Sequence, residues 1–167
     1  KESSAYREAI VLTGNAAGTT ASQLQSAAAA VALSVGTQGK AAETLAALTA
    51  TSRVAAADLG KLAEAAIRLE REGGPAVKET VKAFADLAKD PSKAVVKLNE
   101  DTNFLTLSLY KQIKALDEQG KTAEAAAIAQ VAYADAVTSR TKTLEADLGT
   151  LEKAWRSIAD GAKSAWD

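Results

Sequence analysis

Alanine makes up about a quarter of this 167-residue chain, and this feature limits the possible folds more than any other. Alanine has the highest helix propensity of the common residues and loses no side-chain entropy when a helix forms. Only two prolines interrupt the chain, and it shows little of the apolar–polar alternation of half-buried strands. The sequence therefore predicts an all-α protein of successive αα-hairpins with glycine turns, followed by a long C-terminal helix.

A weak internal repeat organises residues 12–90 into helical hairpins. The segment QGKAAETLAAL at residues 38–48 matches QGKTAEAAAIA at residues 119–129. Between them, GGPAVKETVKAF at residues 73–84 has the same form, a glycine break followed by apolar residues at helical spacing. Glycine suits such turns because it takes the left-handed conformation without a Cβ penalty. The pattern predicts two hairpins with helices at about residues 21–35, 40–50, 56–71 and 75–89.

Residues 91–167 are predicted to hold a pair of capped helices and then one long helix. Asp90 precedes Pro91, an order that suits a helix cap followed by the first helical residue. Polar residues of poor helix propensity at 99–103 predict a break. The next helix, at 107–118, would begin after a threonine and end at a glycine, and the long helix would start near residue 122. The predicted junction residues are Asp90, Pro91, Asn99, Thr106 and Gly120.

The clearest apolar periodicity lies near the C-terminus, where large apolar residues recur at alternating steps of four and three, as in a coiled-coil seam. The residues of this apolar stripe are Leu144, Leu148, Leu151, Trp155 and Ile158. Flanking acids, Glu145, Asp147 and Glu152, would repel one another in a parallel homo-oligomer, and Trp155 is bulky for a two-stranded seam. We therefore expect the stripe to pack within the chain, with a seam between chains as the alternative.

The chain lacks the residues that most catalytic and metal sites require. It has no histidine and no cysteine, which excludes disulfides, imidazole or thiolate metal ligands, and any catalytic triad that needs histidine. Glu100 and Asp101 could form a carboxylate pair, but such a pair needs burial in a cleft to separate the two pKa values. We predict no enzyme, and no catalytic, cofactor-binding or metal-binding residue.

Charge and hydropathy narrow the range of partners. The 20 basic and 21 acidic residues are interspersed and give a net charge of −1, so tight binding to nucleic-acid phosphates is not expected. The longest apolar run, at residues 27–35, has about nine residues, whereas a membrane span needs about 20. Because the first residue is not methionine, we expect residues 1–167 to be one helical segment of a longer polypeptide.

A resemblance to a known family rests mainly on residues 87–134. This stretch contains Lys-Leu-Asn-Glu at residues 97–100 and Tyr-Lys-Gln-Ile-Lys-Ala-Leu-Asp-Glu-Gln-Gly at residues 110–120. With these motifs, and with LGTLEKAW at residues 148–155, the chain resembles the tail-length tape measure proteins of long-tailed, lambda-like bacteriophages and prophages.

The resemblance implies a structural role in the virion tail. Proteins of this family lie in the lumen of the tail tube after assembly in the bacterial host cytoplasm, and their length sets the tube length. The implied partners are tail-tube and tail-tip proteins and other parts of the tape measure chain, with a link to DNA passage and no cofactor. A mostly helical chain suits a ruler, since a helix rises 1.5 Å per residue. The alternative hypothesis is a soluble, TPR-like helical-hairpin adaptor that binds a protein partner.

Overall fold

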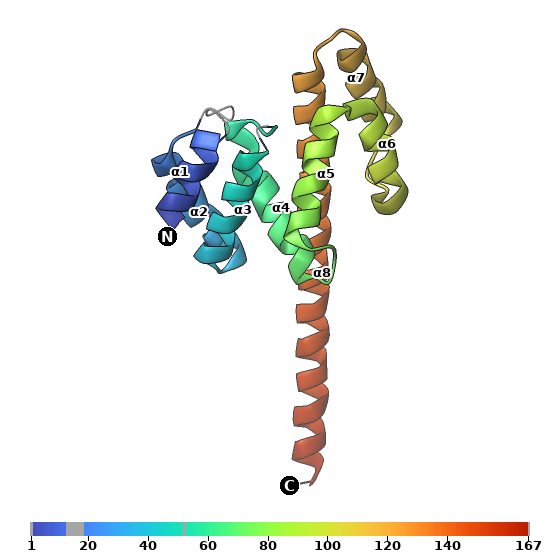
Figure 1. The fold of residues 1–167 in the computed structure, drawn as a ribbon. Helices are drawn as coiled ribbons and strands as arrows, with labels where there is room; N and C mark the ends of the chain where they lie inside the picture. The colour runs from blue at the N-terminus through green and yellow to red at the C-terminus, as the bar shows by residue number, and fades with distance from the viewer. Residues whose placement is uncertain (1, 13–18, 52, 167) are drawn as a thin grey trace.

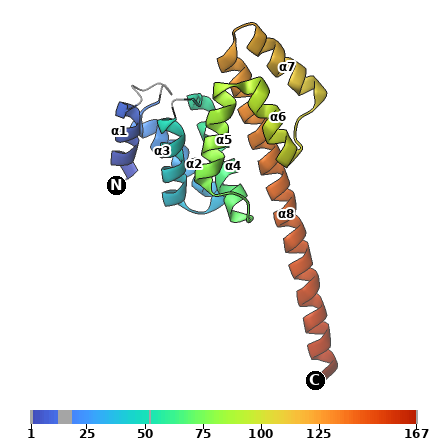
Figure 2. The ribbon, with the colours of Figure 1, turned by 45° about the vertical axis from the view of Figure 1, so that its right-hand side comes forward.

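The computed structural model describes residues 2–12, 19–51 and 53–166, and every regular element in these ranges is helical (Figure 1). The prediction of an all-α fold is confirmed. The elements are α1 (Glu2–Leu12), α2 (Ala21–Val35), α3 (Gln38–Ala50), the short 3₁₀ helix η1 (Ala56–Asp58), α4 (Leu59–Arg71), α5 (Val77–Lys89), α6 (Pro91–Thr102), α7 (Leu107–Glu118) and α8 (Thr122–Trp166). Helices α1 to α7 and the first half of α8 form a helical body, and the rest of α8 extends from it as a single rod (Figures 1 and 2).

The hairpin of α2 and α3 follows from local signals in the sequence. Thr20 and Gln23 form a capping box at the start of α2, in which each side chain accepts a hydrogen bond from the other residue's backbone N–H. Gly36 ends the helix with φ of 86°, a left-handed conformation that favours glycine. The inner face of α2 is buried and consists of Leu24, Ala28, Val31 and Val35.

The hairpin of α4 and α5 has a longer connection than the sequence predicts, residues 72–76 instead of about 72–74. Pro75 is not part of the following helix, because α5 begins only at Val77, where the backbone N–H donates to the Glu70 carboxylate at 2.6 Å. Gly74 lies so close to α4 that a Cβ there would approach the Leu69 carbonyl oxygen to 2.8 Å. The turn therefore needs glycine at this position, and a neighbouring helix supplies the carboxylate at the start of α5.

Helix α1 is an element that the sequence reasoning did not predict. Its buried residues are Tyr6 and Ala9, and the helix lies against α3. Because only these two side chains give α1 an inner face among its described residues, the periodic signal in the sequence is short. The helix is stabilised by burial against α3 more than by its own pattern.

The core of the body is built around the first half of α8, which packs against α4, α5 and α7. The Tyr133 ring meets Phe84 and Phe104 edge-on, with centroid distances of 5.7 and 5.3 Å. Beside them the amide of Gln130 is buried and donates to the carbonyl oxygens of Arg53 and Phe84, at 3.0 and 2.9 Å. These two hydrogen bonds offset the cost of burying a polar side chain, so α8 is fixed to both the loop before α4 and the middle of α5.

Candidate partner surface and helix junction

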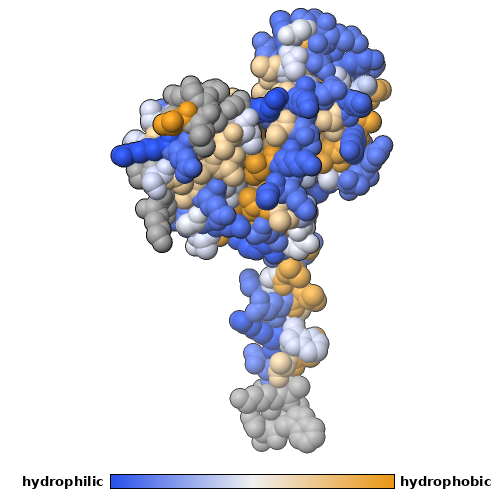
Figure 3. Space-filling view, viewed as in Figure 1, coloured by the Kyte–Doolittle hydropathy of each residue, from blue (hydrophilic) through white to orange (hydrophobic). Residues whose placement is uncertain are grey.

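The apolar stripe lies on the part of α8 that extends beyond the body, residues 142–166, which we name the stalk. All five stripe residues are exposed, with exposed fractions from 41% for Leu144 to 71% for Trp155. The expectation that the stripe packs within the chain is therefore wrong for the part of the chain that the structure describes. Figure 3 shows the apolar residues gathered on one side of the stalk and hydrophilic residues on the other.

The stripe continues a face of α8 that is buried inside the body. Val137 and Thr141 are buried, and the steps from Val137 to Thr141, Leu144 and Leu148 are four, three and four residues. These steps keep side chains on one face of a helix. One face of α8 is thus covered in the body and uncovered along the stalk, because no described helix runs beside the stalk (Figures 1 and 2).

A pocket of about 410 Å³ opens beside the upper end of the stalk. Its lining is mostly apolar and comes from α4, α6, α8 and the two connections that follow α4 and α6. It includes Leu69, Pro75, Leu98, Phe104, Tyr133 and Val137. Thr141, which has the same register as the stripe, also lines the pocket. The pocket and the stripe therefore adjoin on α8 and form one partly apolar surface.

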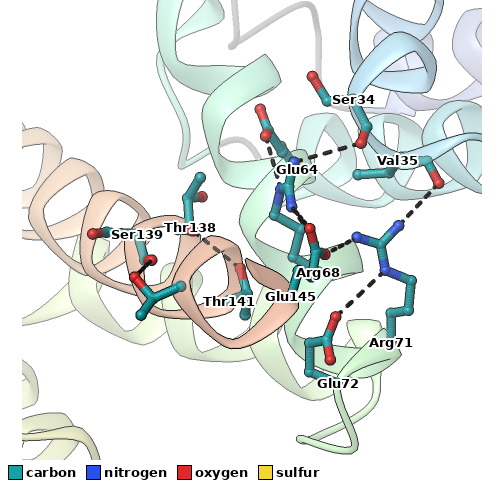
Figure 4. Close-up of polar contacts among 11 residues, drawn as sticks. Ser34, Val35, Glu64, Arg68, Arg71, Glu72, Thr138, Ser139, Thr141 and Glu145 are labelled. Carbon is teal, nitrogen blue, oxygen red and sulfur yellow. Dashed lines mark hydrogen bonds and ion pairs between the residues drawn. The ribbon is translucent and has the colours of Figure 1, made fainter. Parts of the chain in front are cut away.

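The base of the stalk is fixed to the body by two arginines of α4 and Glu145 (Figure 4). Arg68 is buried and contacts the Glu64 carboxylate at 2.9 Å and Glu145 at 3.2 Å. Arg71 forms a second ion pair with Glu145 and also donates to the Val35 carbonyl oxygen at 3.3 Å. The arginines thus join α8 to the C-terminal end of α2, where positive side chains are favourable.

The charge of Glu145 depends on these contacts. Burial, the largest single influence, raises the pKa of its carboxyl, but the Arg71 hydrogen bond and the charges of Arg71 and Arg68 together bring the pKa below the usual 4.5. The folded protein therefore favours the carboxylate form, which is the form that pairs with both arginines. Sequence reasoning missed this group, since Glu145 and Arg68 are 77 positions apart.

The predicted junction contains the expected break, but later in the chain. Asn99 does not end α6; the helix continues to Thr102, and Asn103 follows in the left-handed conformation with φ of 46° and ψ of 55°. Asparagine tolerates this conformation better than most residues do, which decides where the helix ends. The Asn99 side chain instead accepts a hydrogen bond from the Leu105 backbone N–H at 2.8 Å and orders the connection to α7.

At Asn103 we expect substitution by alanine to lower the free energy of unfolding by about 1 kcal/mol, because an alanine in the left-handed region carries a Cβ penalty. Substitution by glycine should change it by only a few tenths, since glycine adopts this conformation freely. Chemical denaturation of the two variants measures the difference. Equal destabilisation by alanine and glycine would mean that the Asn103 side chain, rather than its backbone conformation, matters.

The other junction residues lie at helix ends, but not all of them act as caps. The Thr106 hydroxyl accepts from the Leu109 N–H at 3.1 Å at the start of α7, and Gly120 follows the end of that helix with φ of 78°. Pro91 is the first residue of α6. Asp90 precedes it, yet its side chain forms no capping hydrogen bond. The expected cap at Asp90 is therefore wrong.

The carboxylate that accepts hydrogen bonds from the start of α6 belongs to Asp117 in α7, and the sequence did not predict it. It accepts from the Ser92 hydroxyl, from the Ser92 N–H at 3.4 Å and from the Thr122 hydroxyl at 3.3 Å. These bonds join α7 to the first turns of α6 and α8. A capping residue 25 positions away in the sequence leaves no local signal, so only the fold reveals it.

Asp117 gives the junction a pH dependence. The hydrogen bond from the Ser92 hydroxyl lowers the pKa of its carboxyl below the usual 3.8, with burial opposing and with smaller contributions from the Ser92 N–H and Thr122. The stabilisation is therefore complete above pH 3.8 and is lost as the pH falls through the lower folded pKa. We expect Asp117→Asn to lower Tm by about 2–4 °C at pH 7, from roughly 1 kcal/mol.

The measurement is a series of thermal melts of the wild type and Asp117→Asn from pH 7 to pH 2. The gap in Tm should close at the acidic end, where the carboxyl of the wild type is protonated. A gap that stays constant across the series would show that the charge of Asp117 does not contribute.

Arg140 of α8 completes the junction from the other side. Its guanidinium donates to the carbonyl oxygen of Thr102 and, at 2.7 Å, to that of Asn103. The last carbonyl groups of a helix lack hydrogen-bond donors within the helix. Arg140 supplies such donors at the end of α6. The hydrogen bonds of Asp117 and Arg140 thus join α6 and α7 to α8.

The described residues give little support to other kinds of site. They contain no group of three acidic side chains placed to hold a metal ion. None of the helices in the described ranges is long and apolar enough to cross a membrane. Glu100 and Asp101, the carboxylates that could have formed a pair, are both exposed on α6 and do not line a buried cleft.

Comparisons with known proteins place the chain in a family. Residues 1–114 match the family described as "Prophage tail length tape measure protein". The tape measure protein of Pseudomonas phage PAJU2 is 31% identical over 95% of this chain, and that of Escherichia phage lambda is 25% identical over 97%. The tape measure protein of Escherichia phage N15 is 24% identical over 97% of this chain.

The chain spans only 17% of the length of the PAJU2 protein and 19% of the lambda and N15 proteins. No solved structure is significantly similar to it. The family match covers more than half of the chain and includes all of α1 to α6, and its members are parts of the phage tail. This chain belongs to the prophage tail length tape measure protein family.

Proposed function

We propose that this chain is a structural segment of a tape measure protein, that it helps to set tail-tube length and to assemble the tail, and that it has no enzymatic activity. The observation that carries the proposal, beside the family, is the shape of α8, an unbroken helix of 45 residues. At 1.5 Å per residue such a helix is about 70 Å long. A single helix of this kind covers a long distance along its axis while it is only one helix wide, as a ruler requires.

In this proposal the chain is one helical segment of a longer polypeptide, made in the bacterial host cytoplasm and placed in the lumen of the tail tube. Its partners are tail-tube and tail-tip proteins and other parts of the tape measure chain, and the assembled chain has a role in DNA passage. The exposed stripe of the stalk supports such contacts, because contiguous apolar patches on a protein surface often mark interaction sites.

The test is an in-frame deletion of residues 1–167 from the parent gene, followed by electron microscopy of the tails. If the whole segment lies along the tube as helix, its deletion should shorten the tails by about 250 Å, since each helical residue rises 1.5 Å. Shortening of only about 70 Å would indicate that the body stays folded and that α8 alone acts as the ruler.

A second deletion, of the same number of residues elsewhere in the parent chain, serves as the matched control for assembly. Tails of unchanged length in the first variant, with shortened tails in the control, would refute a ruler role for this segment. Loss of tails in the first variant alone would instead indicate an essential role in assembly.

A further inference from the structure

A cavity of about 340 Å³, which we name the slot, opens at the start of α8, away from the stalk. It is lined by residues 53–55 of the loop before η1, by Ala88 in the last turn of α5 and by four residues of α8 between 123 and 130. Five of these eight lining residues are alanines. Because their side chains are short, the backbone of another chain can come close to α8 there.

The slot contains a buried hydrogen-bond acceptor that has no donor. Only 1% of Gln130 is exposed, and its side-chain nitrogen donates to the carbonyl oxygens of Arg53 and Phe84. These two bonds use both amide protons and fix the orientation of the amide. Its Oε1 atom accepts no hydrogen bond from the described residues, yet it is not sealed inside the protein. Since Gln130 lines the slot, this oxygen is the acceptor that a donor in the slot would meet.

Arg53 supplies a positive charge to the same slot. Its side chain is exposed and is in no ion pair among the described residues. The other lining side chains carry no charge, so the lining itself does not offset the guanidinium. The slot thus combines one positive group, one acceptor oxygen and a wall of alanines.

These three features match the first turn of an α-helix. The first four N–H groups of a helix have no acceptor within the helix, so one of them can donate to the Gln130 oxygen. Acidic side chains are favourable in the same turn because the helix dipole is positive there, and a carboxylate so placed would pair with Arg53. The C-terminal end of a helix would bring carbonyl oxygens to the Gln130 oxygen, and a lysine side chain would bring a second positive charge to Arg53.

We propose that the slot binds the first turn of a helix from a partner protein, a turn that consists of small residues and one aspartate or glutamate. A backbone N–H of this turn donates to Gln130 Oε1, and the carboxylate pairs with the Arg53 guanidinium. The alanines of the slot leave room for the backbone of the turn. This inference adds a docking site on the body and does not depend on whether the segment sets tail length.

The test uses the 167-residue chain and two acetylated helical peptides of about 18 residues, long enough to form a helix. One begins Ser-Ala-Ala-Glu and the other Ser-Ala-Ala-Lys, and the rest of the sequence, with a label at the C-terminal end, is the same. Fluorescence anisotropy measures the two affinities. We expect the acidic peptide to bind about two- to fivefold more tightly at low salt, as for an exposed ion pair, with a smaller difference at high salt because ions screen the charges.

The NMR signals of the Gln130 side-chain amide report on the slot itself. A donor at Oε1 polarises the amide, so the acidic peptide should shift the signals of Nε2 and of its two protons. The matched control is the side-chain amide of Gln112, an exposed glutamine of α7, whose signals should stay in place.

Two variants locate the binding. Arg53→Glu should reverse the preference between the peptides, and Ala123→Phe should abolish binding of both because the ring fills the slot. The matched controls, Lys111→Glu and Ala115→Phe on α7, should leave both affinities unchanged. Since all four positions are exposed, circular dichroism melts of the variants should match the wild type.

No binding of either peptide, or equal affinity for the two, would overturn the proposal. So would binding that survives Ala123→Phe or that leaves the Gln130 signals unmoved, because the peptide would then lie elsewhere on the chain. None of these results depends on the length of the tails, so failure of this inference leaves the proposed function to be judged by the deletion.

Discussion

Replacement of Phe84 by alanine is expected to lower the free energy of unfolding by about 3–5 kcal/mol. Phe84 is fully buried at the centre of the body, and its ring meets Tyr133 edge-on at 5.7 Å. The variant loses the burial of the ring and leaves a cavity that rigid neighbouring helices cannot fill. The backbone carbonyl oxygen of Phe84 also accepts a hydrogen bond from the side-chain amide of Gln130. A shift of α5 in the variant would therefore disturb that buried amide as well.

Urea denaturation followed by circular dichroism measures the effect of Phe84→Ala. The matched control is Leu33→Ala, because Leu33 is an equally apolar residue that is 90% exposed on α2 and should change stability by less than about 0.5 kcal/mol. Similar losses in the two variants would mean that the body has no close-packed centre at Phe84.

Replacement of Arg68 by methionine is expected to lower the free energy of unfolding by about 1–3 kcal/mol, since the variant leaves the Glu64 carboxylate without its arginine and Glu145 with Arg71 alone. The guanidinium is nearly buried, with 6% of the side chain exposed, whereas Glu64 and Glu145 reach solvent. This partial access to water keeps the expected loss below that of a fully buried pair. Methionine preserves most of the length and the apolar stem, so the change isolates the charge.

A double-mutant cycle with Glu145→Gln tests whether the pair is responsible. If the contact matters, the double variant should be more stable than the sum of the two single losses predicts. Hydrogen exchange at residues 138–148 gives a second readout, because a stalk base that is no longer fixed to α4 should exchange faster there. Additive losses with unchanged exchange would show that Arg68 acts on α2 or Glu64 rather than on the stalk.

Several features of the fold could be predicted because they depend on neighbours in the sequence. The helix of residues 107–118 was predicted with its observed bounds, since a capping threonine and a final glycine lie within a few positions of it. The same holds for α2, where the apolar steps identify a buried face. Helix α1 escaped prediction because two buried residues give too short a pattern.

The carboxylates and arginines that act between helices could not be found in this way. Asp90 has the position of a cap but does not form one, while Asp117 and Glu70 serve the starts of helices to which they do not belong. Arg140 of α8 likewise donates hydrogen bonds to the backbone at the end of α6. These partners lie from 7 to 77 residues apart, so their pairing is a property of the packing and not of any local motif.

The sequence by itself determined that the chain is helical, that α8 has one apolar face and that acids flank the face along the stalk. Only the tertiary structure decided that this face is buried as far as Thr141 and exposed from Leu144 onward. The physical reason is length: α4 and α5, which cover the face, have 13 residues each, while α8 has 45. Periodicity shows that a helix has an apolar side, but whether that side is covered depends on how far the neighbouring helices extend.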